Sequence, residues 1–550
     1  MRISARLSTL ILICVICATC CQCTSDYPSK EMLDRITTQG IRANMSYLAD
    51  DLLEGRGTGT RGYQLAAIYI RARFEELGLE AAGENGTYFQ NIPFRQLKPV
   101  PEKDSLVIKR PDGSIKFAFE KDYLMAGDPL HQEASVEAPI VFAGYGVTAP
   151  EAHYDDYAGL DAKGKIVVLV LGAPPTFPSA DRAFYSDDLV KARNAASHGA
   201  IGIIGIWAGE QTKNTPWKEI IRFFHQPVMN WLDDKGVPND YVPEIKAGAF
   251  MNDQSAAALF KGSGHTFDEA MTSITAAKPL SFPLVGTATL HEAATYAEST
   301  SPNIAAVLRG SDPHLKDEYV VFSAHADHVG IGDPVNGDAI YNGAVDNASG
   351  TSALLEIARA FAGEHDRPKR SILFVAVTGE EAGLLGSDYF AKHPTVPISQ
   401  IVADINMDGV SLFYDFKDIV ALGADHSSLD DQVRDVARRM GLEVSPDPMP
   451  EENFFIRSDQ YSFVKQGVPS LAITEGFKTV DPSLDGRKIA IQWETTRYHT
   501  PQDDMSQPLD FNAARKCTRV ILAVGYEVAQ APQRPTWNSG DMFGQRFGRH

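Results

Sequence analysis

Acidic and imidazole side chains in this chain follow directly on short runs of apolar residues. The run YVVFSA leads into His325, the run ILFVAVTG leads into the pair Glu380 and Glu381, and the run IVADIN leads into Met407 and Asp408. Apolar runs of this length are typical of buried strands. Because open α/β sheets place their sites outside the carboxyl ends of the strands, we expect these side chains to meet at one edge of a sheet.

Two further side chains are expected at the same edge. Asp346 lies in the loop DNASGT before an apolar helical segment, and His499 lies in the segment RYHTPQDD. With one of the two adjacent glutamates, the set supplies two imidazoles and three carboxylates. Zinc binds such nitrogen and oxygen ligands and leaves a position open for water in catalytic sites. Two metals that share a carboxylate need about this many side chains, and such a pair activates water and polarises a carbonyl.

The two adjacent glutamates are expected to have different roles. Successive residues do not readily bind one metal together, so one of Glu380 and Glu381 can be a ligand while the other moves the proton as general base. The residues alone leave open which glutamate does which.

Two neighbouring positions complete the hypothesis for the site. Asp327, two residues after His325, is placed to accept the free ring N–H of that histidine and fix its tautomer. Tyr498 is placed to donate a hydrogen bond to a developing oxyanion. Nothing in the pattern pairs His328 or His426 with the other candidates, so both are predicted not to be ligands.

The elements that position these residues are strands and helices in alternation. From about Asn303 onward, apolar runs alternate with amphipathic helices, which predicts an α/β fold with a mainly parallel mixed sheet covered by helices on both faces. The helix containing Leu354 and Phe361 presents one apolar face, and a second helix ends before Gly441. The predicted strands are residues 319–324, 372–377, 401–405 and 470–474.

The rest of the chain divides by changes of pattern. A length of 550 residues favours more than one core. Residues 33–79 have helical periodicity with Gly78 as a C-cap, and short β-type runs follow between Gly and Pro residues. We predict an N-terminal segment (25–130) packed on the catalytic domain, an inserted β-rich domain (131–280), the catalytic domain (281–530) and a polar, poorly ordered tail (531–550).

Residues 1–24 have the pattern of a signal peptide. Arg2 and Arg6 precede an apolar run that is short for a membrane span. The protein is therefore expected to be secreted or periplasmic, with lipid anchoring through one of the early cysteines as an alternative. After cleavage only Cys517 would remain. No later run predicts an integral membrane segment, and the net charge of −20 argues against nucleic acid as a partner.

The motifs SAHADHVG, GAVDNASGTSALLEIAR, VTGEEAGLLGS, INMDG and YHTPQDD together resemble those of peptidase family M28, the zinc aminopeptidases. The resemblance implies a zinc-exopeptidase-like fold and two Zn²⁺ ions, although the native metal stays open. It implies one metal on His325 and Asp408, the other on Glu381 and His499, and Asp346 as the bridge.

The resemblance also implies that Glu380 is the base. By the same resemblance, the inserted domain is similar to a protease-associated domain, and residues 451–467 correspond to a loop and helix that shape the substrate pocket.

The expected function is a metallo-aminopeptidase that hydrolyses peptides or proteins at their N-termini. A carboxypeptidase or dipeptidase on the same scaffold is an alternative, for which Arg457 and Arg497 are the candidate basic residues. A glutaminyl cyclase with one zinc is another. A receptor-like homologue without activity would be expected to have lost ligands or the base, and this chain has kept them.

Overall fold

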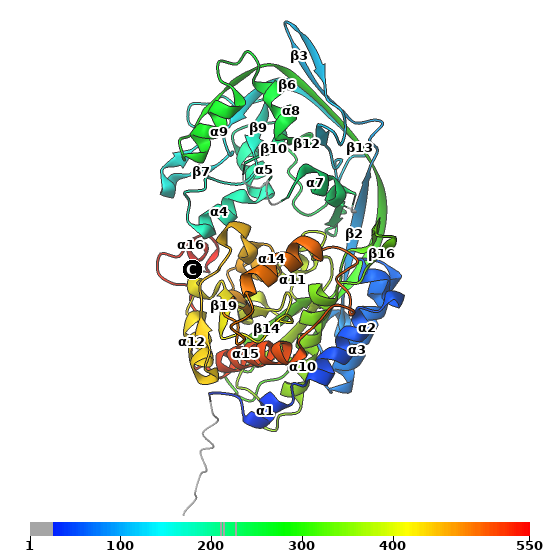
Figure 1. Cartoon of the computed structure of the whole chain (residues 1–550), viewed down its shortest axis with the longest axis vertical. Helices are drawn as coiled ribbons and strands as arrows, with labels where there is room; N and C mark the ends of the chain where they lie inside the picture. Colours follow the sequence, from blue (N-terminus) through cyan, green and yellow to red (C-terminus); the bar gives the residue numbers. More distant parts are fainter. Residues whose placement is uncertain (1–25, 210–211, 213–214, 226–227, 550) are drawn as a thin grey trace, which may run out of the picture.

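The computed structural model describes residues 26–209, 212, 215–225 and 228–549, so the predicted signal peptide lies outside the described residues. The chain forms two halves, one above the other in Figure 1, which are joined by the long strand β13 (Ser281–Leu308). Among the helices of the described part, none combines the length and hydropathy that a membrane crossing needs.

The lower half in Figure 1 is built on a mixed sheet, here called the main sheet. In order across the sheet, its strands are β11 (Val228–Trp231), β2 (Phe89–Pro99), β13, β17 (Ser371–Val377), β14 (Tyr319–His325), β18 (Ile401–Asn406), β21 (Ser470–Glu475), β19 (Asp418–Leu422) and β20 (Glu443–Val444). The short strand β1 (Glu80–Ala81) also pairs with β13. The four central strands β17, β14, β18 and β21 run parallel. These strands contain all four predicted runs.

Helices cover both faces of the main sheet. On one face, Phe322 of β14 packs in a cluster with α10 (Gly350–Ala362) and α15 (Phe511–Gln530). On the other face, Val321 packs in a cluster with residues of α11 (Leu385–Lys392) and α13 (Gln460–Val464). All residues of β14 and β17 are buried, as expected for parallel strands covered on both sides. The predicted α/β fold is confirmed.

Further helices join the first of these clusters and support the sheet from outside. The periodicity of residues 33–79 is present in α2 (Thr38–Leu48) and α3 (Arg61–Glu76), and Gly78 follows with φ 68°. Helix α12 (Leu429–Met440) ends at Gly441 in the left-handed conformation, as predicted. The other helices of this half are α1 (Lys30–Asp34) and α14 (Gly486–Thr496).

The upper half is an inserted module with its own sheet and core. Its strands are, in order across the sheet, β4 (Gly113–Lys116), β3 (Ser105–Arg110), the first part of β13, β6 (Glu133–Ala143), β9 (Ile166–Val170), β10 (Gly202–Trp207), β12 (Gly248–Asn252) and β5 (Tyr123–Leu124). Its helices are α4 (Ser179–Ser186), α5 (Asp188–Ser197), α7 (Trp217–Phe224), α8 (Asp253–Ala256) and α9 (Phe267–Thr275).

The module is wider than the range 131–280 expected from the sequence. Residues 281–293 of β13 pair with β3 and β6, whereas residues 294–308 pair with β2 and β17 of the main sheet. The strand continues from one sheet into the other, so no break in its pattern marks the border. The resemblance of this module to a protease-associated domain stays a prediction.

Residues 532–549 correct the expectation of a poorly ordered tail. Phe543 of α16 (Met542–Phe547) is fully buried, with its ring centroid 4.8 Å from that of His426 and 5.3 Å from that of Phe455. Trp537 donates a hydrogen bond to the Gly467 carbonyl. Isolated aromatic residues in a polar stretch have no periodicity, so this packing could not be predicted from the pattern of residues.

The contact between α15 and β14 makes a testable prediction. A Cβ atom on Gly525 would lie 2.1 Å from Cζ of Phe322. Glycine to alanine within a helix normally stabilises by about 1 kcal/mol, but Gly525→Ala is expected to lower the free energy of unfolding by about 1–3 kcal/mol through overpacking. Urea unfolding measures the change. The exposed Asn512→Ala on the same helix is the control, and a stabilised Gly525→Ala protein would contradict this packing.

Candidate metal centre

The predicted residues meet at the carboxyl edge of the main sheet. His325 is the last residue of β14, Glu380 and Glu381 follow β17, and Asp408 follows β18. Asp346 lies just before α10 and His499 just after α14. Their ligand atoms form groups close enough to hold a metal ion, which are His325 with Asp346 and Asp408, His325 with Glu380 and Glu381, and Asp346 with Glu381, His499 and His328.

Asp346 joins the group of His325 and Asp408 to the group of Glu381 and His499. Its Oδ1 lies 3.3 Å from Nε2 of His325, which in turn lies 3.2 Å from Oδ1 of Asp408. Its Oδ2 lies 3.2 Å from Nε2 of His499, which lies 2.9 Å from Oε2 of Glu381. Each oxygen of this carboxylate therefore faces a different imidazole, which is the arrangement of a bridging ligand.

These separations can be compared with the geometry of bound zinc. Two ligand atoms at about 2.0–2.1 Å from a tetrahedral zinc ion lie about 3.3 Å from each other. The contacts of His325 with Asp346 and Asp408 have this length. Nε2 of His499 is buried and has no hydrogen-bond partner of good geometry, although two carboxylate oxygens lie within 3.2 Å. A buried ring nitrogen that lies among carboxylates without a well-aligned partner suits a metal ligand, so the residues fit a metal pair.

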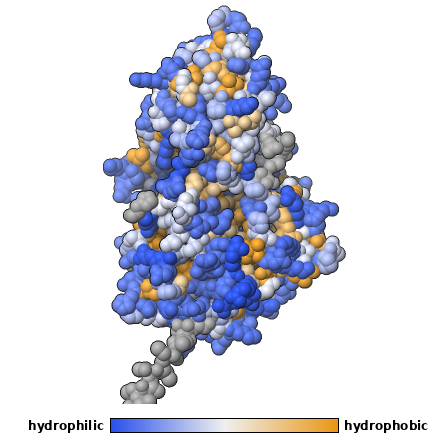
Figure 2. Space-filling view, turned by 90° about the vertical axis from the view of Figure 1, so that its left-hand side faces the viewer, coloured by the Kyte–Doolittle hydropathy of each residue, from blue (hydrophilic) through white to orange (hydrophobic). Residues whose placement is uncertain are grey.

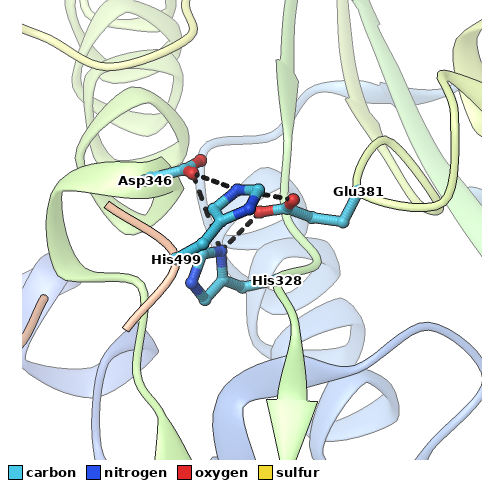
Figure 3. A group of neighbouring side chains, drawn as sticks. All are labelled: His328, Asp346, Glu381 and His499. Atoms are coloured by element: carbon cyan, nitrogen blue, oxygen red, sulfur yellow. Dashed lines mark hydrogen bonds and ion pairs between the residues drawn. The ribbon is translucent and has the colours of Figure 1, made fainter. Parts of the chain in front are cut away.

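His328, which the sequence pattern left without a partner, lies inside the site. Figure 3 shows its ring and that of His499 directed at Glu381, with Asp346 on the far side. Nδ1 of His328 is 2.5 Å from Oε1 of Glu381 and 3.9 Å from Oδ2 of Asp346. The only sequence signal was its position three residues after His325. By contrast, His426 pairs with Asp541 at 2.6 Å and contributes to none of the three metal-binding groups.

Asp327 is fully buried beside the site, but its predicted contact differs in detail. Its backbone carbonyl lies 3.2 Å from Nδ1 of His325, whereas its carboxylate Oδ1 is 3.9 Å away. The carboxylate instead accepts hydrogen bonds from the Thr58 hydroxyl and from the backbone N–H of Glu380. Asp327 thus links the turn that follows β14 to the loop that carries the two glutamates.

Tyr498 lies against the metal-binding group, with its ring stacked on His499 at 3.8 Å between centroids. Burial and the carboxylates of Asp346 and Glu381 raise the pKa of the Tyr498 hydroxyl well above its usual value. The hydroxyl therefore keeps its proton and remains a hydrogen-bond donor.

The charged groups of the site shift one another's pKa values. Burial disfavours the charged form of His499, but Glu381 and Asp346 outweigh it and raise the pKa of His499 to about 10. Burial also opposes ionisation of Glu381, but the pull of His499 outweighs it and lowers the pKa of Glu381 to about 2. Burial, together with the carboxylates of Asp408 and Glu381, raises the pKa of Glu380 well above its usual value, although His325 opposes this.

Arg56 and Asp503 support the site. The sequence analysis assigned neither residue a role. The fully buried guanidinium of Arg56 donates to backbone carbonyls of the loops beside His325 and Asp346, and so brings a positive charge close to the carboxylates. The carboxylate of Asp503 accepts the backbone N–H groups of Val345 and Asp346. Their signals lay in the motifs GRGTG and PQDD, which carried no assigned roles.

A cavity of about 280 Å³ opens beside Glu380 and Asp408. Its walls come from β19, β21, α14 and residues 447–460, and they are mainly apolar. Figure 2 shows a largely polar face with apolar surface at mid-height. The side chains that line the cavity include Val410, Phe413, Val420, Leu422, Met449, Phe454, Arg457, Ile473, Ala490, Trp493, Glu494 and Tyr498.

Comparison with known proteins finds a family match in the second half of the chain. Residues 303–525 match the model of peptidase family M28. A probable zinc metalloprotease of Pyrenophora tritici-repentis is 30% identical over 265 residues, which cover 42% of this chain and 58% of that protein. A probable leucine aminopeptidase of Arthroderma otae is 27% identical over 237 residues, with the same coverage. The match thus spans little more than half the length of these relatives.

A solved structure shares the fold over almost the whole chain. The aminopeptidase from Aneurinibacillus sp. strain AM-1 aligns with a TM-score of 0.52 and 20% sequence identity, over 93% of this chain and 97% of that chain. At this identity the likeness concerns the architecture, which includes the inserted module.

The raised pKa of His499 predicts that zinc binding releases protons. In the metal-free protein at pH 8, a pKa of about 10 keeps this imidazole protonated, and zinc requires its neutral form. Binding should therefore release at least about one proton per chain at pH 8, and this release should fade as the pH rises through about 10. Calorimetric titrations with zinc in buffers of different ionisation enthalpy measure it. Binding without proton release would contradict the arrangement.

Proposed function

Because residues 303–525 belong to peptidase family M28, we propose that this protein is a secreted two-zinc aminopeptidase that removes apolar residues from the N-termini of peptides. The observation that carries the proposal is the Asp346 carboxylate, whose two oxygens face His325 and His499 next to an apolar cavity. His325 and Asp408 would hold one zinc, and Glu381 and His499 would hold the other.

Zinc ions bound there would polarise the scissile carbonyl and lower the pKa of a water molecule. Glu380 lines the cavity, is half-buried, and has a carboxylate oxygen within 4.8 Å of a ring nitrogen of His325. We assign it the role of general base, which takes the proton of the attacking water and then delivers it to the leaving amine.

Tyr498 lines the same cavity and keeps its hydroxyl proton. A hydroxyl donor at this position would stabilise the negative charge that develops on the carbonyl oxygen. The stacking of Tyr498 on His499 would hold the donor in place relative to the metal ligands.

The cavity suggests which N-terminal residues are accepted. Its walls bring aliphatic and aromatic side chains together, and a buried apolar side chain of leucine size gains about 1.5–3 kcal/mol relative to exposure. Glu494 and Asp447 lie among the lining residues, and carboxylates at the cavity attract the free α-amino group of a substrate rather than a terminal carboxylate.

The carboxypeptidase alternative depends on a free basic residue at the cavity. Arg457 lines the cavity, but it lies 3.6 Å from a carboxylate oxygen of Glu452. Arg497 donates to the backbone carbonyl of Gln502. Neither arginine is a dedicated receptor for a substrate carboxylate, so aminopeptidase activity is the better supported function.

Substitution of Glu380 tests the proposed base. Glu380→Gln keeps the shape of the side chain but cannot take up the proton, so kcat on leucine p-nitroanilide is expected to fall about 10²–10⁴-fold while the zinc content is unchanged. Elemental analysis and initial rates of the same samples measure both quantities. The exposed Glu443→Gln is the matched control. Full activity of Glu380→Gln would rule out the assigned role.

Filling the cavity tests the proposed specificity. Ala490 lines the cavity from α14, so Ala490→Phe should reduce its volume without disturbing the metal ligands. We expect kcat/KM to fall at least about tenfold for N-terminal phenylalanine or leucine, the effect of losing roughly 1.4 kcal/mol, and to change little for N-terminal alanine. Parallel assays on the three aminoacyl substrates give the ratios. An equal loss on all three would show that the cavity does not hold the first side chain.

A further inference from the structure

His328 lies in a buried space that fits its imidazole, beside the proposed zinc ligands. It lies three residues beyond the end of β14 and is only 1% exposed. The ring packs against Gly343, where a Cβ atom would lie 2.5 Å from Cγ of His328. Gly343 also has φ 59°, a conformation that other residues rarely adopt. The space for this imidazole therefore depends on a glycine in the loop that precedes Asp346.

The two carboxylate oxygens of Glu381 contact different imidazoles. Nδ1 of His328 forms a hydrogen bond with Oε1 at 2.5 Å, whereas Oε2 lies 2.9 Å from Nε2 of His499. Figure 3 shows the two rings on separate oxygens of this carboxylate. Oε1 is thus engaged by His328, and Oε2 is the oxygen that faces His499.

The distances distinguish a hydrogen bond from shared coordination. Two ligands on one tetrahedral zinc lie about 3.3 Å apart, as His325 lies from Asp346 and Asp408. The contact between His328 and Glu381 is much shorter, at 2.5 Å, and is also shorter than the 2.9 Å between His499 and Glu381. Nε2 of His328, the other ring nitrogen, is buried without a hydrogen-bond partner. A ring that uses Nδ1–H as a donor explains both observations, because Nε2 then carries no proton that needs an acceptor.

Backbone contacts fix His328 from the opposite side. Its N–H donates to the carbonyl of Arg56 at 3.3 Å. The Arg56 guanidinium donates to the carbonyls of Asn342 and Gly343, which form the loop that the imidazole packs against. The position of the ring is thus set by the segment around Arg56 together with that loop.

We propose that His328 is a positioning residue that limits Glu381 to a single-oxygen contact with zinc and so sets the affinity of the metal position shared with His499. This inference rests on the proposed metal pair. It assigns His328 no contact with substrate or metal. Partners of this kind typically change metal affinity by about 10–100-fold when they are removed.

Zinc titration of three variants tests the proposal. The metal-free forms of wild type, His328→Leu and His328→Asn are titrated against a competing chelator, and circular dichroism and thermal melting show that each is folded. In His328→Leu, one of the two zinc affinities should fall about 10–100-fold while the other is retained. In His328→Asn, the side-chain amide can donate in place of Nδ1–H, so this affinity should stay close to that of the wild type.

His426→Leu is the matched control, since it removes a histidine that pairs with a carboxylate outside the metal-binding groups, and both affinities should be unchanged. Three results would overturn the proposal. The two affinities of His328→Leu could equal those of the wild type, or both could fall together. His328→Asn could also behave like His328→Leu, which would make the imidazole itself a ligand. A wild-type protein without zinc affinity would instead refute the proposed metal centre.

Discussion

Burial of negative charge is the constraint on which the site depends. Asp327, Asp346, Glu380 and Glu381 lie close together at the end of the main sheet, and a carboxylate away from water is stable only when it is paired or bound to a cation. The imidazoles of His325 and His499 supply part of this compensation. Zinc would supply the rest, so the same arrangement that is costly without metal gives the site its affinity for it.

The fold meets this constraint by holding each charged group on a rigid support. The parallel strands β14, β17 and β18 end at one edge, and their covered faces fix those ends in place. Hydrogen bonds between buried side chains and backbone groups hold the loops of the site in place. Asp503 holds the backbone N–H of Asp346, and Arg56 ties together the loops on both sides of it. The N-terminal segment therefore supports the candidate metal centre as well as contributing to the core.

The sequence predicted the residues whose position follows from strand ends. His325, Glu381 and Asp408 each lie at or just beyond a strand, and the rule for open α/β sheets brings such residues together. His328 was missed because its contact with Glu381 depends on the turn after β14, which no periodicity describes. The border of the inserted module was misplaced because β13 passes through two sheets in one strand. Phe543 was missed because a single buried aromatic residue leaves no pattern.

The central claim is that Asp346 bridges two zinc ions. Anomalous X-ray scattering at the zinc edge from crystals of the zinc-loaded protein tests it most directly. The account predicts two peaks about 3.5–4 Å apart, one beside His325 and Asp408 and the other beside Glu381 and His499, with the Asp346 carboxylate between them. A single peak, or two peaks that do not share Asp346, would contradict it.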